Sequence, residues 1–469
     1  MQPREESELT SGDLAKPMLR LAWPIVVLQL LQVAYNLADT VWLGAYSTAA
    51  VGALSLAFPL IFFLISVGGG FTAAGSILVA QRTGAGDDRG AGLVAGQTLA
   101  FVGIVAVLLG ALGFALVDPM LSLLPADPET KAVVIPMAAD YMRVFFLGTP
   151  FLFGFFVFTS LMRGYGDTRA PMRVMLASVV LNVVLDPLVI FGWGPIPELG
   201  ITGAAVATVG SRMLATALGL YVLFRTDAGP TITRPDLRLR LEPVREIVRL
   251  GVPSALEQSA SSLAMITLTA MIATFPPAVV AAYGLGNRLS SLVFLPAMGL
   301  GQATNTIVGQ NLGAERPDRA GSAVRLAGLA VAAVMVVLSV VAFLVPTQLA
   351  GAFVSTGTQQ AAETVAYAAD YLRVMAVMFV FMGVLQVALG AFRGAGKTRT
   401  SLAFSLVALW FVRVPATYYL VFVADWGAMG IWTAVALGDV IGCLAALAWL
   451  ARGTWKNADV RDVDTHPAD

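Results

Sequence analysis

Charged side chains are scarce in this sequence. Only 12% of its 469 residues are Asp, Glu, Lys or Arg, whereas 58% are hydrophobic. Water-soluble domains carry roughly 25% charged residues, so this low density indicates a chain embedded in a lipid bilayer. The 29 basic residues balance the 29 acidic ones. Because there is no net positive charge, we do not expect nucleic acid as a partner.

Cysteine and histidine are almost absent. Cys443 is the only cysteine, which excludes an internal disulfide bond and a cysteine-based metal cluster. The only histidine, His466, lies in the polar C-terminal tail, which excludes a histidine-dependent catalytic triad inside the membrane. No Walker motif occurs, so direct coupling to ATP is not expected. We therefore predict neither a cofactor nor an enzymatic activity.

Long apolar runs are what the sequence has in abundance. They recur along the whole length, and each is roughly 20 residues or longer, which is enough for a helix to cross a bilayer. No low-complexity linker divides them. The sequence predicts an all-α membrane protein with twelve transmembrane helices, near residues 18–43, 53–80, 93–117, 134–160, 172–192, 201–224, 250–274, 280–308, 324–345, 362–390, 402–423 and 428–450.

The loops between these runs alternate in charge. Arginines crowd the connection from Arg225 to Arg249, whereas the opposite loops contain Lys131 as their one clear cation, beside acids such as Asp118, Glu198 and Asp425. Basic loops stay on the cytoplasmic side of a membrane. We therefore expect a multi-pass protein of the plasma membrane, with both termini in the cytoplasm.

The chain repeats itself at an offset of about 229 residues. Gln81–Ala91 aligns with Gln310–Ala320, and Arg163–Arg169 aligns with Arg393–Arg399. An even number of spans in each repeat gives both halves the same orientation. We predict two parallel six-helix lobes, at residues 15–225 and 249–453, joined by a cytoplasmic loop at 226–248, around a central cavity. This is a transporter plan; a duplication that only builds a large stable bundle is the alternative.

One carboxylate lies inside the first apolar run, Ile25–Gly44. Placing the charge of Asp39 at the centre of a membrane costs from about 3 to more than 10 kcal/mol, so an acid in this position predicts a functional site. Asp186 lies in the fifth run, with Asn182 one helical turn before it. Counting about 1.5 Å per helical residue places Asp39, Asp186 and Thr208 at similar depths in the outer half of the membrane.

Four oxygen-bearing side chains are thus predicted to meet: Asp39, Asn182, Asp186 and Thr208. Pro187 also frees the backbone carbonyl group of Val183. These oxygen atoms are suitable ligands for a hard cation such as Na⁺, and the two acids could instead share a proton. The alternative is that each acid only forms a hydrogen bond with a neighbouring helix.

The second half lacks these acids. The repeat offset maps Asp39 to Leu268, Asn182 to Val412 and Asp186 to Ala416, so the ion site is expected in the N-terminal lobe alone. The second half has buried charges of its own. We favour a structural ion pair between Arg413 and Asp439 over a substrate role, and Glu257 could face a cytoplasmic vestibule.

Three further residues predict a cavity for amphipathic organic compounds. Gln32 and Tyr35 precede Asp39 by one to two turns, and Tyr141 lies near the outer end of the fourth span. Polar contacts between packed helices, or an interfacial aromatic belt, are the alternative.

The sequence resembles the multidrug and toxic compound extrusion (MATE) family. The similarity is carried by Leu21–Gly44, the Q-x-x-G-A loop at Gln81, RGYGDTR at Arg163, LNVVLDP at Leu181 and GITGAAVAT at Gly200. The resemblance implies a twelve-helix antiporter that exports organic cations and other drugs in exchange for Na⁺ or H⁺. The archaeal and DNA-damage-inducible F-like branch is the most similar, and its N-lobe motif matches the four oxygen-bearing residues. That branch also implies that Gln32, Tyr35 and Tyr141 border the drug cavity.

Other functions compete with this interpretation. A flippase for a lipid-linked oligosaccharide, from the same superfamily, would need a cationic cavity, and Arg143, Arg373 and Arg413 keep it open. An intramembrane aspartyl protease would need two acids that share a proton, but the duplicated plan argues against it. We therefore predict an exporter that works as a monomer in the bilayer on small-molecule drugs and organic cations.

Overall fold

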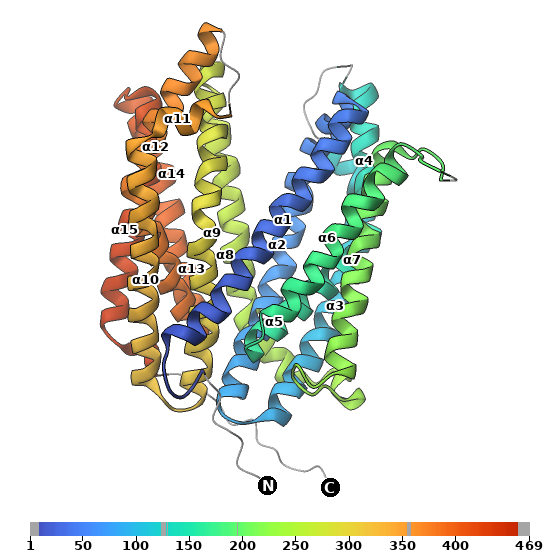
Figure 1. The fold of residues 1–469 in the computed structure, drawn as a ribbon, viewed down its shortest axis with the longest axis vertical. Helices are drawn as coiled ribbons and strands as arrows, with labels where there is room; N and C mark the ends of the chain where they lie inside the picture. Colours follow the sequence, from blue (N-terminus) through green and yellow to red (C-terminus); the bar gives the residue numbers. More distant parts are fainter. Residues whose placement is uncertain (1–8, 123–127, 129, 195, 354–357, 458–469) are drawn as a thin grey trace. The chain divides into compact units, whose positions relative to one another are not determined.

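The chain folds into helices joined by short connections, as the computed structural model shows (Figure 1). The structure describes residues 9–122, 128, 130–194, 196–353 and 358–457. No β-strand occurs within these ranges, which confirms the predicted all-α fold. His466 lies outside the described residues.

Most of the predicted spans are helices of sufficient length and hydropathy. Within the described ranges, ten helices are long and apolar enough to cross a membrane, or eleven if a bent pair is one span. The predicted span 250–274 corresponds to α8 (Leu241–Ile272), which is 32 residues long. Glu257, Gln258 and the serines that follow them lower the mean hydropathy of α8, so it is not among the eleven.

The helices group into two compact units. The N-terminal unit comprises Leu21–Ser76 and Arg89–Thr274. Its helices are α1 (Ala15–Tyr46), α2 (Thr48–Gly84), α3 (Asp88–Ser122), α4 (Ile135–Leu147), α5 (Thr149–Tyr165), α6 (Arg169–Ile190), α7 (Gly200–Arg225) and α8, where α1, α2 and the first residue of α3 extend beyond the unit. The predicted lobe limits at residues 225 and 249 stay predictions.

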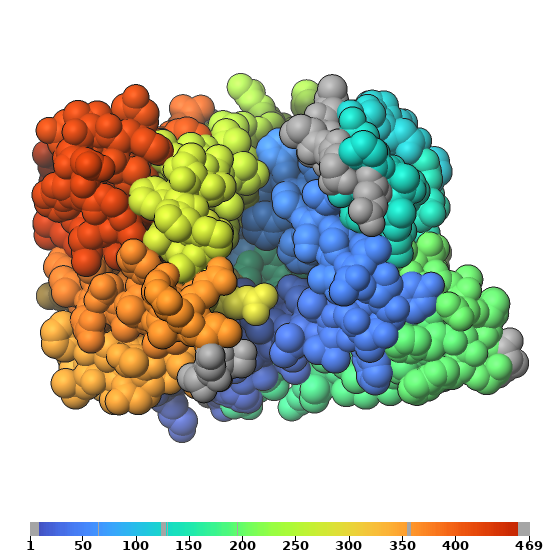
Figure 2. Space-filling view, turned by 90° about the horizontal axis from the view of Figure 1, so that it is seen from above, coloured from blue at the N-terminus to red at the C-terminus, as the bar shows by residue number. Residues whose placement is uncertain are grey.

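The C-terminal unit comprises Ile77–Asp88, the described residues up to Arg20 and the described residues from Phe275 onward. In Figure 2, the orange segment that holds α11 and the start of α12 lies beside the lighter orange of α10. The unit contains α9 (Pro277–Gly313), α10 (Pro317–Leu344), α11 (Pro346–Gly351), α12 (Gln359–Gly394), α13 (Thr398–Leu406), α14 (Val414–Tyr418) and α15 (Gly427–Ala451).

Two predicted spans are irregular. The span 134–160 is bent by 53° between α4 and α5, because Gly148 ends α4 and Pro150 follows in the first turn of α5. The span 402–423 contains two π-helical stretches, Val407–Arg413 and Tyr419–Val423, on either side of α14. Hydropathy gives the length of a span but not such local changes of helical pitch.

The turns after α2 and α9 repeat in geometry as they do in sequence. Gly86 has a φ of 73°, and Glu315, 229 residues later, has a φ of 57°. In both turns an amide bonds back to a carbonyl five residues earlier, Asp87 to Arg82 and Arg316 to Asn311. This pattern closes a helix with a left-handed residue. The backbone thus supports the predicted duplication, although a glycine occupies the left-handed position in only one of the two turns.

The connection between α7 and α8 packs against the start of α3. Asp236 is fully buried and accepts hydrogen bonds from Arg89 Nη1 and Nη2 at 2.7 and 2.6 Å and from Thr233 Oγ1 at 2.6 Å. Gln97 of α3 donates to the carbonyl oxygens of Asp236 and Arg238 at 2.6 and 2.7 Å. The loop predicted at 226–248 is therefore fixed to the N-terminal unit.

A short strap precedes α1 in the C-terminal unit. Asn311 Nδ2 donates to the carbonyl oxygen of Leu9 at 3.0 Å, and Arg316 Nη1 donates to that of Thr10 at 2.5 Å. Arg319 donates to the carbonyl oxygens of Ser11 and Gly12, both at 2.8 Å. Residues 9–12 are thus attached to the second copy of the repeated loop.

Candidate functional site

The four oxygen-bearing residues predicted from the sequence are all buried within the N-terminal unit. Asp39 of α1 is 7% exposed and Thr208 of α7 is 6% exposed, whereas Asn182 and Asp186 of α6 are fully buried. Figure 1 shows these three helices within the same unit. Two carboxylates therefore lie away from water, where charge is costly unless it is compensated.

The structure brings these four side chains together. Asn182 Nδ2 donates to Asp186 Oδ1 at 3.1 Å, and Thr208 Oγ1 donates to Asp39 Oδ2 at 3.4 Å. The carboxyl groups of Asp39 on α1 and Asp186 on α6 also interact electrostatically. We call these four residues the acidic cluster. Their predicted role in cation binding stays a prediction.

Three oxygen atoms of the acidic cluster are buried without a hydrogen-bond partner. They are Asp39 Oδ1, Asn182 Oδ1 and Asp186 Oδ2. Leaving a buried polar atom unsatisfied costs about 1–3 kcal/mol, and more if the group is charged. Oxygen-only ligands from two carboxylates and an amide fit a hard monovalent cation, and a proton on a carboxyl group would also satisfy them. The residues present therefore fit either coupling ion.

Hydrogen bonds next to the cluster hold its three helices in register. Ser178 Oγ donates to the Ser211 carbonyl oxygen at 3.0 Å, which joins α6 to α7. Tyr35 Oη lies 2.9 Å from Ser211 Oγ and donates to the Thr208 carbonyl oxygen at 3.3 Å, which joins α1 to α7. A Cβ atom at Gly203 would lie 2.5 Å from the Val189 carbonyl oxygen, so glycine permits the close approach of α7 to α6.

Arg212 was not predicted from the sequence. It follows Thr208 by one turn of α7 and is only 3% exposed. Its Nη2 atom donates to Gln32 Oε1 at 2.8 Å, and its guanidinium carbon lies 4.6 Å from the centre of the Tyr35 ring. The signal was available, because an arginine inside the apolar run 201–224 is as unusual as the acids.

The predicted substrate-binding residues adjoin the cluster. Tyr35 and Tyr141 are 2% and 4% exposed, and Gln32 is half-buried. Tyr141 interacts with Thr208 and stacks on Phe145. Gln32 Nε2 donates to Asn36 Oδ1 at 3.1 Å and its oxygen accepts from Arg212. Their predicted role at the border of a drug cavity stays a prediction.

The charged residues of the second half have different surroundings. Arg413 Nη2 lies 2.7 Å from Asp439 Oδ2, which confirms the predicted ion pair. Glu257 of α8 is buried, with 4% of its surface exposed, and its position at a vestibule stays a prediction.

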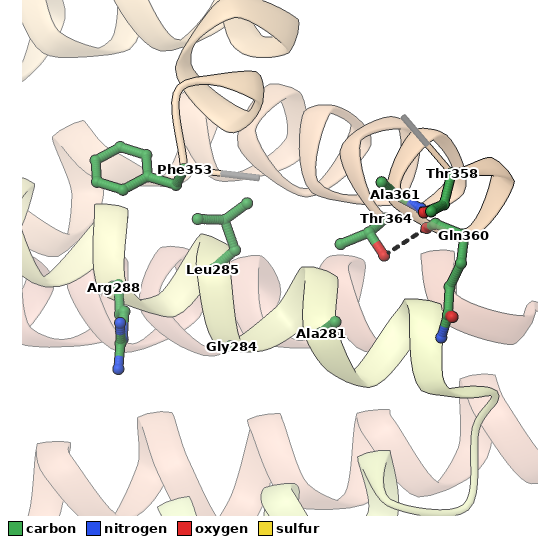
Figure 3. A pocket seen from close by; sticks show the side chains of 9 residues that line it. All are labelled: Ala281, Gly284, Leu285, Arg288, Phe353, Thr358, Gln360, Ala361 and Thr364. Atoms are coloured by element: carbon green, nitrogen blue, oxygen red, sulfur yellow. Dashed lines mark hydrogen bonds between the residues drawn. The ribbon is translucent and has the colours of Figure 1, made fainter. Parts of the chain in front are cut away.

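The C-terminal unit contains a cavity of about 630 Å³ (Figure 3). Arg288 of α9 is the charged residue in its lining, which also includes Phe353, just after α11, and Thr364 of α12. None of the predicted site residues lines it. The remaining lining residues are Ala281, Gly284, Leu285, Thr358, Gln360 and Ala361.

Comparison with known proteins gives matches along nearly the whole chain. The family model MatE matches residues 24–188 and 253–419, two stretches that start 229 residues apart. The probable multidrug resistance protein YpnP of Bacillus subtilis is 30% identical over 96% of this chain and 97% of its own length. An FAD transporter of Shewanella oneidensis is 31% identical over 69% of this chain and 71% of its own length.

A solved structure is also similar. The crystal structure of MATE in complex with MaL6 superposes with a TM-score of 0.87 at 26% identity, over 97% of this chain and 99% of the other. The double match of the family model has the same spacing as the internal repeat found in the sequence.

Proposed function

The chain belongs to the MATE family of multidrug transporters, and from this premise we propose that it exports small organic compounds in exchange for Na⁺ or H⁺. The coupling ion binds at the acidic cluster of Asp39, Asn182, Asp186 and Thr208. Organic cations are the substrate class that a cavity next to buried acids would attract. The protein works as a monomer in the plasma membrane, with both termini in the cytoplasm.

The observation that carries this proposal is the set of unsatisfied oxygen atoms. Asp39 Oδ1, Asn182 Oδ1 and Asp186 Oδ2 come from two different helices and are buried in one cluster. If the acids served only to join helices by hydrogen bonds, each would be expected to have its buried oxygen atoms paired. Unpaired acceptors at neighbouring carboxylates are instead what a site for a cation or a proton requires.

The cluster can couple ion and substrate through α1. Without an ion, two close carboxylates repel each other, and a cation or proton relieves this repulsion. Relief of the repulsion allows α1 to move toward α6, and the same helix carries Gln32 and Tyr35, the predicted border of the drug cavity. Pro24 lies near the start of α1 and removes a backbone hydrogen bond, so the helix can bend there. Ion and drug then exclude each other, which is the condition for antiport.

The flippase alternative has less support. A flippase needs a cationic cavity. The three arginines that could supply this positive charge are each paired with an acid. Arg143 lies 2.6 Å from Asp118 and 2.9 Å from Asp140, and Arg373 lies 2.8 Å from Asp370. Arg413 is paired with Asp439. Local pairing of this kind leaves little positive charge for a pyrophosphate.

Transport by the purified protein in liposomes tests the proposal. Ethidium movement would be followed while a Na⁺ gradient and a pH gradient are imposed separately, with FAD as a second substrate because a relative is named an FAD transporter. We expect one of the two gradients to drive ethidium transport in the wild type and to fail in Asp39→Asn and Asp186→Asn.

Asp140→Asn is the matched control. Asp140 is a carboxylate of the same unit, but its side chain is 56% exposed and lies outside the cluster. Ethidium transport that responds to neither gradient in the wild type would reject the proposal. Gradient-driven transport that persists in both cluster variants would reject the site.

A further inference from the structure

Arg212 is a buried charge that the proposed coupling mechanism does not use. It lies on α7, in the interior of the N-terminal unit, at 3% exposure. Removing a guanidinium group from water costs several kcal/mol, even after the surroundings relax. Such a charge is expected to be compensated by nearby groups or to serve the site beside it.

The contacts of Arg212 hold the guanidinium group in place without neutralising it. Its described hydrogen bonds go to Gln32 Oε1 at 2.8 Å and to the sulfur atom of Met175 at 3.2 Å, and neither acceptor is a carboxylate. The rings of Tyr35 and Phe155 lie 4.6 and 5.4 Å from its guanidinium carbon. Cation–π contacts of this kind stabilise a cation but leave its charge intact.

The charge of Arg212 acts on the acidic cluster. Arg212 lies one turn from Thr208 on α7, and Tyr35, which it contacts, lies one turn from Asp39 on α1. Asp39 and Arg212 interact electrostatically across the two helices. Arginine stays protonated in proteins, so this positive charge is permanent.

The acidic cluster and Arg212 together have an uneven number of charges. With both carboxyl groups ionised, Asp39 and Asp186 contribute two negative charges, and Arg212 contributes one positive charge. The other titratable groups that adjoin the cluster, Tyr35 and Tyr141, are neutral phenols at physiological pH. The group as a whole therefore has a single negative charge, which one monovalent cation or one proton balances.

We propose that Arg212 is a tethered cation that limits the site to one coupling ion per transport cycle. It occupies, in effect, the place of a second ion next to two carboxylates. This inference rests on the proposed function and goes beyond it, because two acids alone are compatible with two coupling ions. Arg212 is a positioning residue in this account, since it acts through the charge of the acids and not by direct contact with the transported ion.

The test is the coupling ratio, measured in liposomes with the membrane potential clamped at zero by valinomycin and equal K⁺. Ethidium carries one positive charge. With one ion exchanged per ethidium, an ion gradient of about tenfold sustains an ethidium gradient of about tenfold; with two ions, it sustains one of about a hundredfold. At a tenfold ion gradient, we expect the wild type to sustain an ethidium gradient of about tenfold and Arg212→Met to sustain one of about a hundredfold. The methionine removes the charge but keeps an unbranched side chain.

Arg212→Lys separates charge from packing. It keeps the positive charge but cannot reproduce the planar contacts with Tyr35 and Phe155. We expect it to sustain the same ethidium gradient as the wild type, about tenfold. An ethidium gradient of a hundredfold in the wild type or in Arg212→Lys would overturn the inference, even if Arg212→Met does not fold. A folded, active Arg212→Met that sustains the same ethidium gradient as the wild type would also overturn it. If neither ion drives ethidium transport in the wild type, the proposed function fails and this inference fails with it.

Discussion

Removing one partner of the Arg413–Asp439 ion pair is predicted to destabilise the C-terminal unit. The two residues come from the π-helical stretch Val407–Arg413 and from α15, and their side chains are only 16% and 11% exposed. Arg413→Met leaves a carboxylate buried without its partner, and Asp439→Leu leaves a guanidinium group in the same condition. The double variant removes both charges and keeps much of the volume.

The structure sets the size of the effect. Breaking a buried pair typically costs about 3–5 kcal/mol, because an uncompensated charge remains. Since both side chains retain slight exposure, we expect each single variant to lose about 3 kcal/mol, or roughly a hundredfold in the ratio of folded to unfolded protein. The double variant is expected to lie within about 1 kcal/mol of the wild type, because replacing a whole buried pair by apolar residues is often neutral.

The chain provides its own reporter for this measurement. Cys443 is the sequence's one cysteine, is buried, and lies one turn after Asp439 on α15. A dye that fluoresces on reaction with a thiol therefore reports when α15 opens. Thermal scans in detergent would give the midpoint for the wild type, both single variants and the double variant.

The pair Arg373–Asp370 is the matched control. Its atoms are 2.8 Å apart in the same unit, but its side chains are 48% and 46% exposed, so its loss is expected to cost less than about 1 kcal/mol. Single variants at Arg413 and Asp439 with the wild-type midpoint would refute the reasoning. So would a double variant that is as unstable as the two single changes added together.

Three further predictions concern other parts of the chain. Burial raises the pKa of Asp236, but hydrogen bonds from Arg89 and Thr233 outweigh it and lower this pKa to about 2. Since this is below the unfolded value of about 3.9, the pair stabilises the fold fully above about pH 4 and loses its effect as pH falls through 2. Thermal scans should therefore show Arg89→Met to be less stable than the wild type by about 1 kcal/mol at pH 7, and this difference in stability should shrink toward pH 2. A difference in stability that is constant with pH would contradict this. Arg319→Met should speed backbone hydrogen exchange in residues 9–14 roughly tenfold, because two hydrogen bonds to the carbonyl oxygens of this strap are lost. Arg325→Met, which changes an exposed side chain of the same helix, should leave this exchange unchanged. In intact cells, a cysteine in place of Glu198 should react with an impermeant thiol reagent and one in place of Arg238 should not; the reverse pattern would overturn the proposed topology.

The large features of the fold could be predicted because the bilayer makes them conspicuous in the sequence. A helix that crosses a membrane needs a long apolar run, so the predicted span 53–80 lies within α2, and 280–308 lies within α9. The repeat could be predicted because both copies keep the residues of the same turn, and Gly86 and Glu315 share its left-handed conformation. Asp39 and Asp186 were identified because each interrupts an apolar run at a high energetic cost.

Other features depend on packing that a single sequence does not reveal. The bend at Gly148 and the π-helical stretch Val407–Arg413 change the course of a helix without changing its hydropathy. Arg212 was missed for a different reason. Only the acids in the apolar runs of the first lobe were interpreted as costly buried charges, although a buried arginine is costly too. Only the structure shows that Gln32 and Tyr35, predicted to face substrate, also contact Arg212.

The effect of the coupling ion on drug affinity tests the central claim most directly. The claim is that the acidic cluster binds an ion whose presence excludes the drug, and linkage then requires each ligand to weaken the other by the same factor. Ethidium dissociation constants would be measured on the purified protein with and without Na⁺, and at neutral and lower pH. We predict that one of the two ions raises the dissociation constant of the wild type by about fivefold or more and leaves that of Asp39→Asn unchanged. An ethidium affinity that is indifferent to both ions in the wild type would contradict the account, even if export itself were observed.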